Sequence, residues 1–227
     1  MFNRRRSDNR REEPKPEWIP RTEIGRMVKA GKITSIEEIY KMGKPVLEHE
    51  IIDHFFPDLK DETLEIRSTQ RVTDCGRKAQ FRAVILIGDS SGHFGIGVGK
   101  SEEVKPAIES AIKCAKRNMI CVPFGSGSWE DKGDYTNSIP VGATGKCGSA
   151  TVTLKPAPRS LGVVANKIVK KILQKAGIKD VWTSAKGRTS NILNMAFATQ
   201  NAVEALNTIA GATWQQYPNP RLKKVRI

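Results

Sequence analysis

The sequence predicts an α+β fold of two small α/β sandwich domains, with a helical extension before them and basic tails. Extended apolar segments followed by one helical pattern predict a β-β-β-α domain over 64–127. A second alternation over 137–211 predicts a β-β-α-β-α domain. A glycine-rich stretch with few apolar residues separates them, and 227 residues are enough for two cores.

Both ends of the chain are predicted to be basic tails. Residues 1–17 carry six Arg and Lys residues among acids and prolines, and they offer almost nothing to bury. They predict a mobile arm, which is either a solvated tail or a segment that orders on RNA. Residues 212–227 are basic and interrupted by prolines, with no core pattern.

Residues 18–60 are predicted to form a helical extension. The segment TEIGRMVKAGKI places its apolar residues on one helical face, and either Thr34 or Ser35 can cap the helix that follows. Gly31 and Gly43 punctuate these helices.

The first domain is predicted to contain a strand at 64–71 and a hairpin. The segment 81–87 is almost uniformly apolar, and after a turn the chain returns with Phe94, Ile96 and Val98 at a period of two. These three side chains then share one face of the return strand. Glycines alternate with them on the other face, where another backbone can come close.

A helix is predicted to follow, over the segment PAIESAIKCAKRNMI. Its apolar residues recur at spacings of three and four, which is typical of a helix with one buried face. Pro106 leaves two starting points open, because it suits the first turn best. Either Ser101 caps a short turn, or the helix begins near Lys105.

The second domain is predicted to follow a linker that begins at Pro123. Its expected elements, in chain order, are strand 139–144, strand 148–154, loop 155–162, helix 163–176, strand 178–183, loop 185–191 and helix 192–209.

Charge is the strongest compositional signal. The chain has 38 Lys and Arg residues against 24 Asp and Glu residues, a formal net charge of +14. Such an excess favours a polyanionic partner, with nucleic acid ahead of an anionic membrane surface. The longest wholly apolar run, 83–87, is far too short to span a bilayer. The first residues lack the apolar stretch of a secretory signal, so we expect a cytoplasmic protein without a membrane partner.

The segment GHFGIGVGKS ends like a phosphate-binding loop, but its spacing is wrong. A nucleotide-binding loop requires a glycine where this chain has Phe94. Glu102 and Glu103 follow and would repel a polyphosphate. The segment 84–89 resembles the strand that ends in a metal-binding Asp in nucleotide-binding proteins. In those proteins a helix and further strands separate this strand from the phosphate-binding loop, whereas here only a short turn joins it to GHFGIGVGKS. We therefore predict no nucleotide cofactor.

Catalytic and metal sites are also not predicted. Ser160 has no histidine in the second half of the chain to act as its base, and Asp180 and Glu204 stand alone as acids. The four cysteines form no Cys-x-x-Cys pair and do not group with the histidines, which favours reduced, partly buried thiols over a zinc site. We expect no enzyme, no cofactor and no small-molecule substrate.

Basic residues group in the predicted loops, where a rigid scaffold presents contacts to phosphates. Lys155 belongs to this group in the second domain. The residues predicted to bind RNA are Arg67, Arg71, Arg77, Lys78, Arg82, Lys100, Lys116, Arg117, Lys146, Arg159, Lys167, Lys186 and Arg188.

The loop 155–162 has two possible interpretations. It precedes a predicted helix, so the free N–H groups of that helix could meet a phosphate beside Arg159. It could equally be a rigid strand-to-helix connection.

Two long segments carry a family resemblance. RSTQRVTDCGRKAQFRAVILIGDSSGHFGIGVGKSEEVKPAIESAIKCAKRNMI resembles the double-stranded-RNA-binding-like first domain of small-subunit ribosomal protein five, the universal uS5 family. CGSATVTLKPAPRSLGVVANKIVKKILQKAGIKDVWTSAKGRTSNILN is similar to its second domain, and WIPRTEIGRMVKAGKITSIEEIYKMGKPVLEHEIID resembles the archaeal and eukaryotic branch, more specifically an archaeal member.

The resemblance implies a structural protein of the small ribosomal subunit. It implies a three-stranded sheet on one helix, then a domain with a left-handed βαβ crossover, an exception to the usual handedness. It also implies contacts with ribosomal RNA and with small-subunit proteins four and eight, a place near the messenger RNA entry path, and a role in translational accuracy. The loop Thr73–Lys78 corresponds to one that reaches toward RNA. The alternative is a free regulator that binds double-stranded RNA, which the first domain alone would support.

Overall fold

The structure is a computed structural model and describes residues 18–131 and 136–208. The predicted arm 1–17, the predicted tail 212–227 and the last residues of the second predicted domain lie outside the described residues.

The predicted α+β fold class is confirmed, with two four-stranded sheets. The first has the order β1-β2-β3-β4 and the second β5-β6-β8-β7. The helices are α1 (Glu23–Lys29), α2 (Ile36–Lys41), α3 (Glu50–Phe55), α4 (Val104–Arg117), α5 (Lys167–Lys175) and α6 (Ile192–Thr208). The strands are β1 (Lys60–Thr73), β2 (Gly76–Gly88), β3 (His93–Ser101), β4 (Met119–Cys121), β5 (Ala143–Cys147), β6 (Ala150–Pro156), β7 (Val163–Val164) and β8 (Val181–Lys186).

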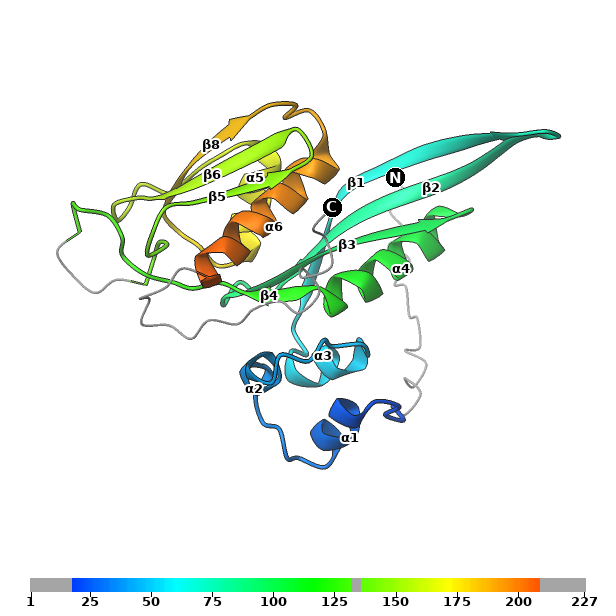
Figure 1. Cartoon of the computed structure of the whole chain (residues 1–227), viewed down its shortest axis with the longest axis horizontal. Helices are drawn as coiled ribbons and strands as arrows, with labels where there is room; N and C mark the ends of the chain where they lie inside the picture. Colours follow the sequence, from blue (N-terminus) through cyan, green and yellow to red (C-terminus); the bar gives the residue numbers. More distant parts are fainter. Residues whose placement is uncertain (1–17, 132–135, 209–227) are drawn as a thin grey trace, which may run out of the picture.

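The elements stack in layers (Figure 1). Helix α4 packs on one face of the first sheet, and helices α5 and α6 contact the other face. The same two helices contact the inner face of the second sheet, so they lie between the sheets. Phe94 and Ile96 of β3 therefore share one buried cluster with Val152 and Leu154 of β6. The two predicted units are joined by this common core.

The alternating pattern of β3 is confirmed, and it explains the glycines of GHFGIGVGKS. Phe94 and Ile96 are fully buried on the face toward α5 and α6. On the opposite face the glycines meet the backbone of α4, where a Cβ added to Gly97 would overlap the carbonyl oxygen of Ala111. Gly95 and Gly99 meet α4 carbonyl groups one turn further along in each direction.

The helical extension packs beneath α4. Ile24, Ile39 and Ile51 are buried in a second cluster with Ile85 of β2 and Ala111 of α4. The hydroxyl group of Tyr40 donates a hydrogen bond to the carbonyl oxygen of Met119 (2.9 Å). These contacts attach the extension to the first domain.

Several boundaries differ from those the sequence predicts. Met119 and Ile120 were predicted to end a helix, but they belong to β4, which pairs with β3. Helix α4 begins at Val104 after Glu103, which agrees with the predicted start near Lys105 and not with a turn capped by Ser101. The fifth strand begins at Ala143 and not near Ile139, which is buried just before it.

The predicted helix 163–176 is also shorter than expected. Val163 and Val164 form β7, which pairs in parallel with β8, and α5 begins only at Lys167. Helix α5 therefore connects two parallel neighbouring strands, as a βαβ unit does. The left-handed crossover that the resemblance implies stays a prediction.

The caps of the first two helices differ from each other. The Thr22 side chain accepts a hydrogen bond from the N–H of Gly25 and caps α1. Ser35 occupies the capping position of α2, as one predicted alternative has it, but its side chain makes no capping hydrogen bond. The N–H of Thr34 instead donates to Glu38 (3.3 Å).

The carboxylate of Glu48 holds the start of the extension. It accepts hydrogen bonds from the N–H groups of Arg21 (2.8 Å) and Thr22 and from the indole of Trp18 (2.9 Å). Partial burial raises the pKa of Glu48, but these hydrogen bonds outweigh it and lower the pKa below its ordinary value.

We predict that the extension loosens in acid through Glu48. Because the pKa is lowered in the folded state, the stabilisation is present above the unfolded-state value and is lost as pH falls through the folded-state value. Hydrogen exchange at the Arg21 and Thr22 amides should therefore accelerate below pH 4.5 beyond the trend of other helix amides. Glu48→Gln should exchange faster at neutral pH and lose this acid step; an unchanged acid step in the variant would contradict the assignment.

Candidate nucleic-acid interface

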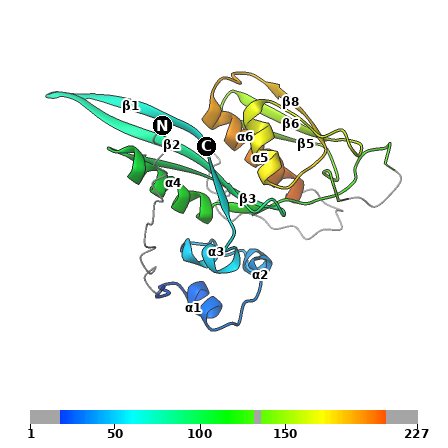
Figure 2. The ribbon, with the colours of Figure 1, turned by 180° about the vertical axis from the view of Figure 1, so that it is seen from behind.

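The hairpin of β1 and β2 projects from the body of the molecule (Figure 1, Figure 2). A two-residue turn, Asp74 and Cys75, joins the strands, whose pairing extends from Lys60 opposite Gly88 to Thr73 opposite Gly76. The strands are therefore longer than the predicted segments, and most of the predicted loop Thr73–Lys78 is regular hairpin. Near the tip almost all residues are exposed.

Five of the predicted cations lie on one face of this hairpin and its neighbour β3. The register places Arg67 opposite Arg82, Arg71 opposite Lys78, and Arg82 opposite Lys100. Cross-strand partners share a face, and so do residues an even number apart on one strand. We call these five residues the hairpin basic face. Arg77 pairs with Val72 and lies on the opposite face.

A groove runs over the hairpin basic face. Its lining residues are Thr69, Gln70, Arg71, Lys78, Gln80 and Lys100. Thr69 and Gln80 are cross-strand partners and were not predicted as site residues. Their even spacing from Arg71 and Arg82 is the signal that could have identified them.

Two carboxylates partly balance the hairpin basic face. Glu65 pairs with Arg67 (2.9 Å) and Arg82 (3.4 Å), while Lys78 pairs with Glu102 (3.0 Å). Arg82 is the most enclosed of the three cations, with 20% of its side chain exposed against 62% for Arg67. Five cations against two carboxylates leave the hairpin basic face with a net positive charge. Arg71 and Lys100 make no ion pair with the described residues.

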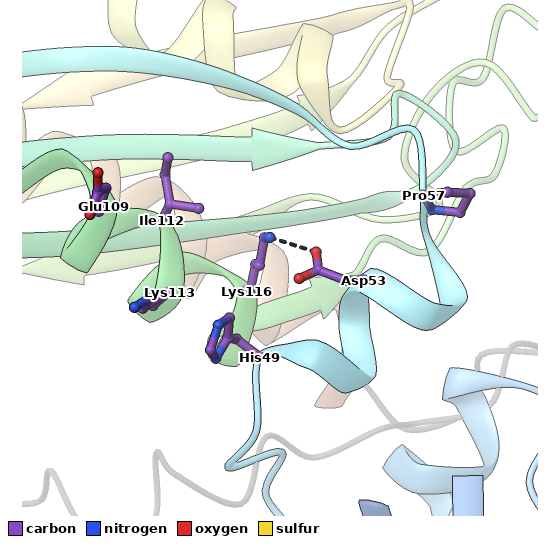
Figure 3. Close-up of a pocket in the computed structure, with 7 residues that line it drawn as sticks. All are labelled: His49, Asp53, Pro57, Glu109, Ile112, Lys113 and Lys116. Carbon is purple, nitrogen blue, oxygen red and sulfur yellow. Dashed lines mark hydrogen bonds and ion pairs between the residues drawn. The ribbon is translucent and has the colours of Figure 1, made fainter. Parts of the chain in front are cut away.

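Lys116 and Arg117 lie elsewhere, at the end of α4 on the far side of the first sheet. The ammonium group of Lys116 points to the carboxylate of Asp53 in α3, across a pocket also lined by His49 and Lys113 (Figure 3). The guanidinium group of Arg117 donates to the carbonyl oxygen of Lys113 (3.2 Å). The structure therefore does not bring these two predicted residues to the hairpin basic face.

The remaining candidates belong to the second domain. Lys146 and Lys186 are exposed on β5 and β8, Arg188 is in the loop after β8, and Lys167 is the first residue of α5. Arg159 is exposed in the loop after β6, where its N–H donates to Asp131 (3.4 Å).

The loop 155–162 behaves as a rigid connection and not as a phosphate site at a helix start. It leads into β7, so Arg159 does not adjoin the first turn of α5. The N–H of Gly162 donates to the carboxylate of Asp180 (2.7 Å), and the N–H of Ala157 donates to Ser138 (3.2 Å). These hydrogen bonds fix the loop to its surroundings.

The two segments that resemble nucleotide-binding motifs have structural roles. GHFGIGVGKS lies in and just before β3, and Asp89 closes the turn ahead of it by accepting hydrogen bonds from the N–H groups of Ser91 (2.8 Å) and His93 (3.0 Å). Within 18–131 and 136–208, no three His, Cys, Asp or Glu residues are grouped to hold a metal. Cys75 is exposed, whereas the other three thiols are partly buried. No helix in the described part of the chain is long and apolar enough to cross a membrane.

Comparison with known proteins assigns the chain to a family. The model of the ribosomal protein S5 N-terminal domain matches residues 59–123, and the model of the S5 C-terminal domain matches residues 145–216. The small ribosomal subunit protein uS5 of Methanospirillum hungatei is 50% identical over 195 residues, which cover 86% of this chain and 95% of that protein. The chain belongs to the ribosomal protein S5 family. The S5 relative from Methanocaldococcus jannaschii is 47% identical over 191 residues, covering 84% of this chain and 88% of that protein.

The N-terminal S5 match covers the first sheet, and the C-terminal S5 match begins within β5 of the second sheet. The N-terminal S5 match begins just before β1 and ends just after β4, so it includes the whole hairpin. Helices α1, α2 and α3 precede it.

Proposed function

We propose that the protein is a non-catalytic structural constituent of the small ribosomal subunit, in the cytoplasm, and that it binds ribosomal RNA. The observation that carries the RNA contact is the hairpin basic face, which gathers five cations on one projecting surface. The cations of this face displace the counterions that are condensed on the phosphates of a bound polyanion, and this release favours binding at moderate salt.

The geometry favours contact with the RNA backbone over the reading of base edges. Arg71 and Lys78 are opposite one another on neighbouring strands, about 5 Å apart, so one phosphate can be contacted by both side chains. Thr69 and Gln80 add hydrogen-bonding groups beside them. Phosphate contacts of this kind fix position and orientation without selecting a sequence.

All thirteen predicted cations remain candidates for ribosomal RNA contact, in different surroundings. The hairpin basic face is the strongest group. Lys116 is the weakest candidate, because Asp53 already engages its ammonium group and only 17% of its side chain is exposed.

The finer placement is also part of the proposal. The family resemblance supports contacts with small-subunit proteins four and eight, a position near the messenger RNA entry path, and an influence on translational accuracy. A rigid layered body suits such a role, because a common core fixes the hairpin relative to the second domain.

A free regulator that binds double-stranded RNA is the alternative, and a competition experiment separates the two. The full-length protein would be bound to small-subunit ribosomal RNA and challenged with a bare duplex of about 16 base pairs, the length that one double-stranded-RNA-binding domain spans. We expect the duplex to compete weakly and to be released at moderate salt while ribosomal RNA stays bound. Equal or tighter binding of the bare duplex would support the regulator.

A further inference from the structure

The second sheet has one face that no helix of the described residues covers. Helices α5 and α6 lie on its inner side, where Val152, Leu154 and Val181 are fully buried. The opposite side is the outer surface of the stack of layers (Figure 1, Figure 2). The side chains at its outward positions are all exposed or half-buried.

The strand register arranges these outward side chains in three rows. The rows are Lys146, Thr151 and Lys186; Thr144, Thr153 and Ser184; and Lys155, Trp182 and Val164. Neighbours in one row are about 5 Å apart, and neighbouring rows are about 7 Å apart. We call these nine residues the open sheet face.

The charged side chains of the open sheet face are all basic. It contains three lysines, four hydroxyl side chains and no carboxylate. The lysines are exposed and make no ion pair with other residues in 18–131 and 136–208. Trp182 has 45% of its surface exposed and is the cross-strand partner of Lys155. A half-exposed indole among unpaired cations offers stacking and phosphate contacts together.

We propose that the open sheet face binds a single-stranded segment of RNA. Lys146, Lys155 and Lys186 contact its phosphates, and one base stacks on Trp182. The hydroxyl row between them is placed to hydrogen-bond ribose 2′-hydroxyl groups. Proteins that bind single strands combine cations that contact the backbone with aromatic side chains that stack on bases. Stacking tolerates any sequence, because every base has a face that can stack.

A protein partner fits this surface less well. Cores of protein interfaces are depleted of charged residues, and lysine in particular is depleted from interfaces, yet here lysines lie in both outer rows. The apolar part consists only of Trp182 and Val164. Complementary charge and stacking therefore favour RNA.

This inference rests on the proposed ribosomal RNA binding, but it concerns a different surface. Helices α5 and α6 separate the open sheet face from the first sheet, so substitutions on one face leave the other in place. A failure of the hairpin to bind RNA and a failure of the open sheet face to bind RNA can thus be measured separately.

The test is binding of a fluorescein-labelled, mixed-sequence oligoribonucleotide of about 12 nucleotides to the full-length protein, followed by anisotropy. Trp182→Leu keeps an apolar side chain and removes the aromatic face; we expect binding to weaken at least fivefold. The triple variant Lys146→Gln, Lys155→Gln and Lys186→Gln should lower the salt slope by about 2.

A matched triple variant controls for the loss of charge. Lys105 and Lys113 are exposed on α4, which packs on the first sheet, and Lys32 is exposed just after α1. Their replacement by Gln should alter the salt slope far less. Thermal melting of each variant establishes that it is folded. If folded Trp182→Leu and lysine variants both bind like the control, the proposal is overturned. It is also overturned if they impair entry into small subunits while oligoribonucleotide binding is unchanged, because the partner would then be a protein.

Discussion

Gly97→Ala is expected to destabilise the protein by about 3 kcal/mol or more, at the upper end of the range for overpacked sites. The new Cβ would overlap the carbonyl oxygen of Ala111 and the N–H group of Ala115 in α4. Both are backbone atoms of a hydrogen-bonded helix, so no side chain can rotate away. Relief requires α4 to move from the sheet, which uncovers the buried residues Ala111 and Ala115.

The measurement is chemical denaturation of the wild type and of two variants. Gly142→Ala is the matched control, because its added Cβ would lie 3.5 Å from the carbonyl oxygen of Leu154, an ordinary contact. Gly142→Ala should change stability by less than about 1 kcal/mol. Similar destabilisation in both variants would show that the close packing of β3 on α4 is not the cause.

Because one core joins the two sheets, we also expect both sheets to unfold in one transition.

The second large effect is expected from the hairpin basic face. The triple variant Arg71→Gln, Lys78→Gln and Lys100→Gln should lower the salt slope of ribosomal RNA binding by about 3. If the affinities converge near 1 M salt, that slope corresponds to a loss of about 10³-fold at 0.1 M salt. These residues line one groove and do not pair with Glu65, so the variant leaves no half-buried carboxylate without its partners.

Two comparisons control this prediction. The same exposed lysine triple, Lys32, Lys105 and Lys113, removes equal charge from another surface and should change the slope far less. Arg77→Gln tests the face itself: each contact to a phosphate is worth about one unit of slope, and Arg77 lies on the opposite face of the hairpin. We expect a smaller effect for Arg77→Gln than for Arg71→Gln. The reverse order would place the RNA on the other side.

Local periodicity accounts for much of the fold. The alternation in β3 predicts both the buried stripe with Phe94 and the glycine face, because a strand has only two faces. It does not identify what covers each face. Phe94 packs with the second domain and Gly97 with α4, and this depends on contacts distant in sequence. Short elements are also hidden, since two or three residues such as Val163–Val164 form a strand only beside a partner.

The candidate site was predicted as a set of cations and not as a surface. Arg77 and Lys78 are adjacent in the sequence and look equivalent if the segment is a loop. Because the turn consists only of Asp74 and Cys75, Arg77 and Lys78 both lie in β2 and point to opposite faces. In the same way, Lys116 looks like a surface cation until the helical extension brings Asp53 to it. Register and long-range packing decide these roles.

The central claim is that the protein acts as a component of the small ribosomal subunit. Its most direct test is sedimentation of a cell lysate through a sucrose gradient, with detection of the full-length protein in each fraction. The protein should migrate with the small subunit and with assembled ribosomes, in a constant ratio to small-subunit ribosomal RNA. Recovery at the top of the gradient, apart from small subunits, would contradict the claim.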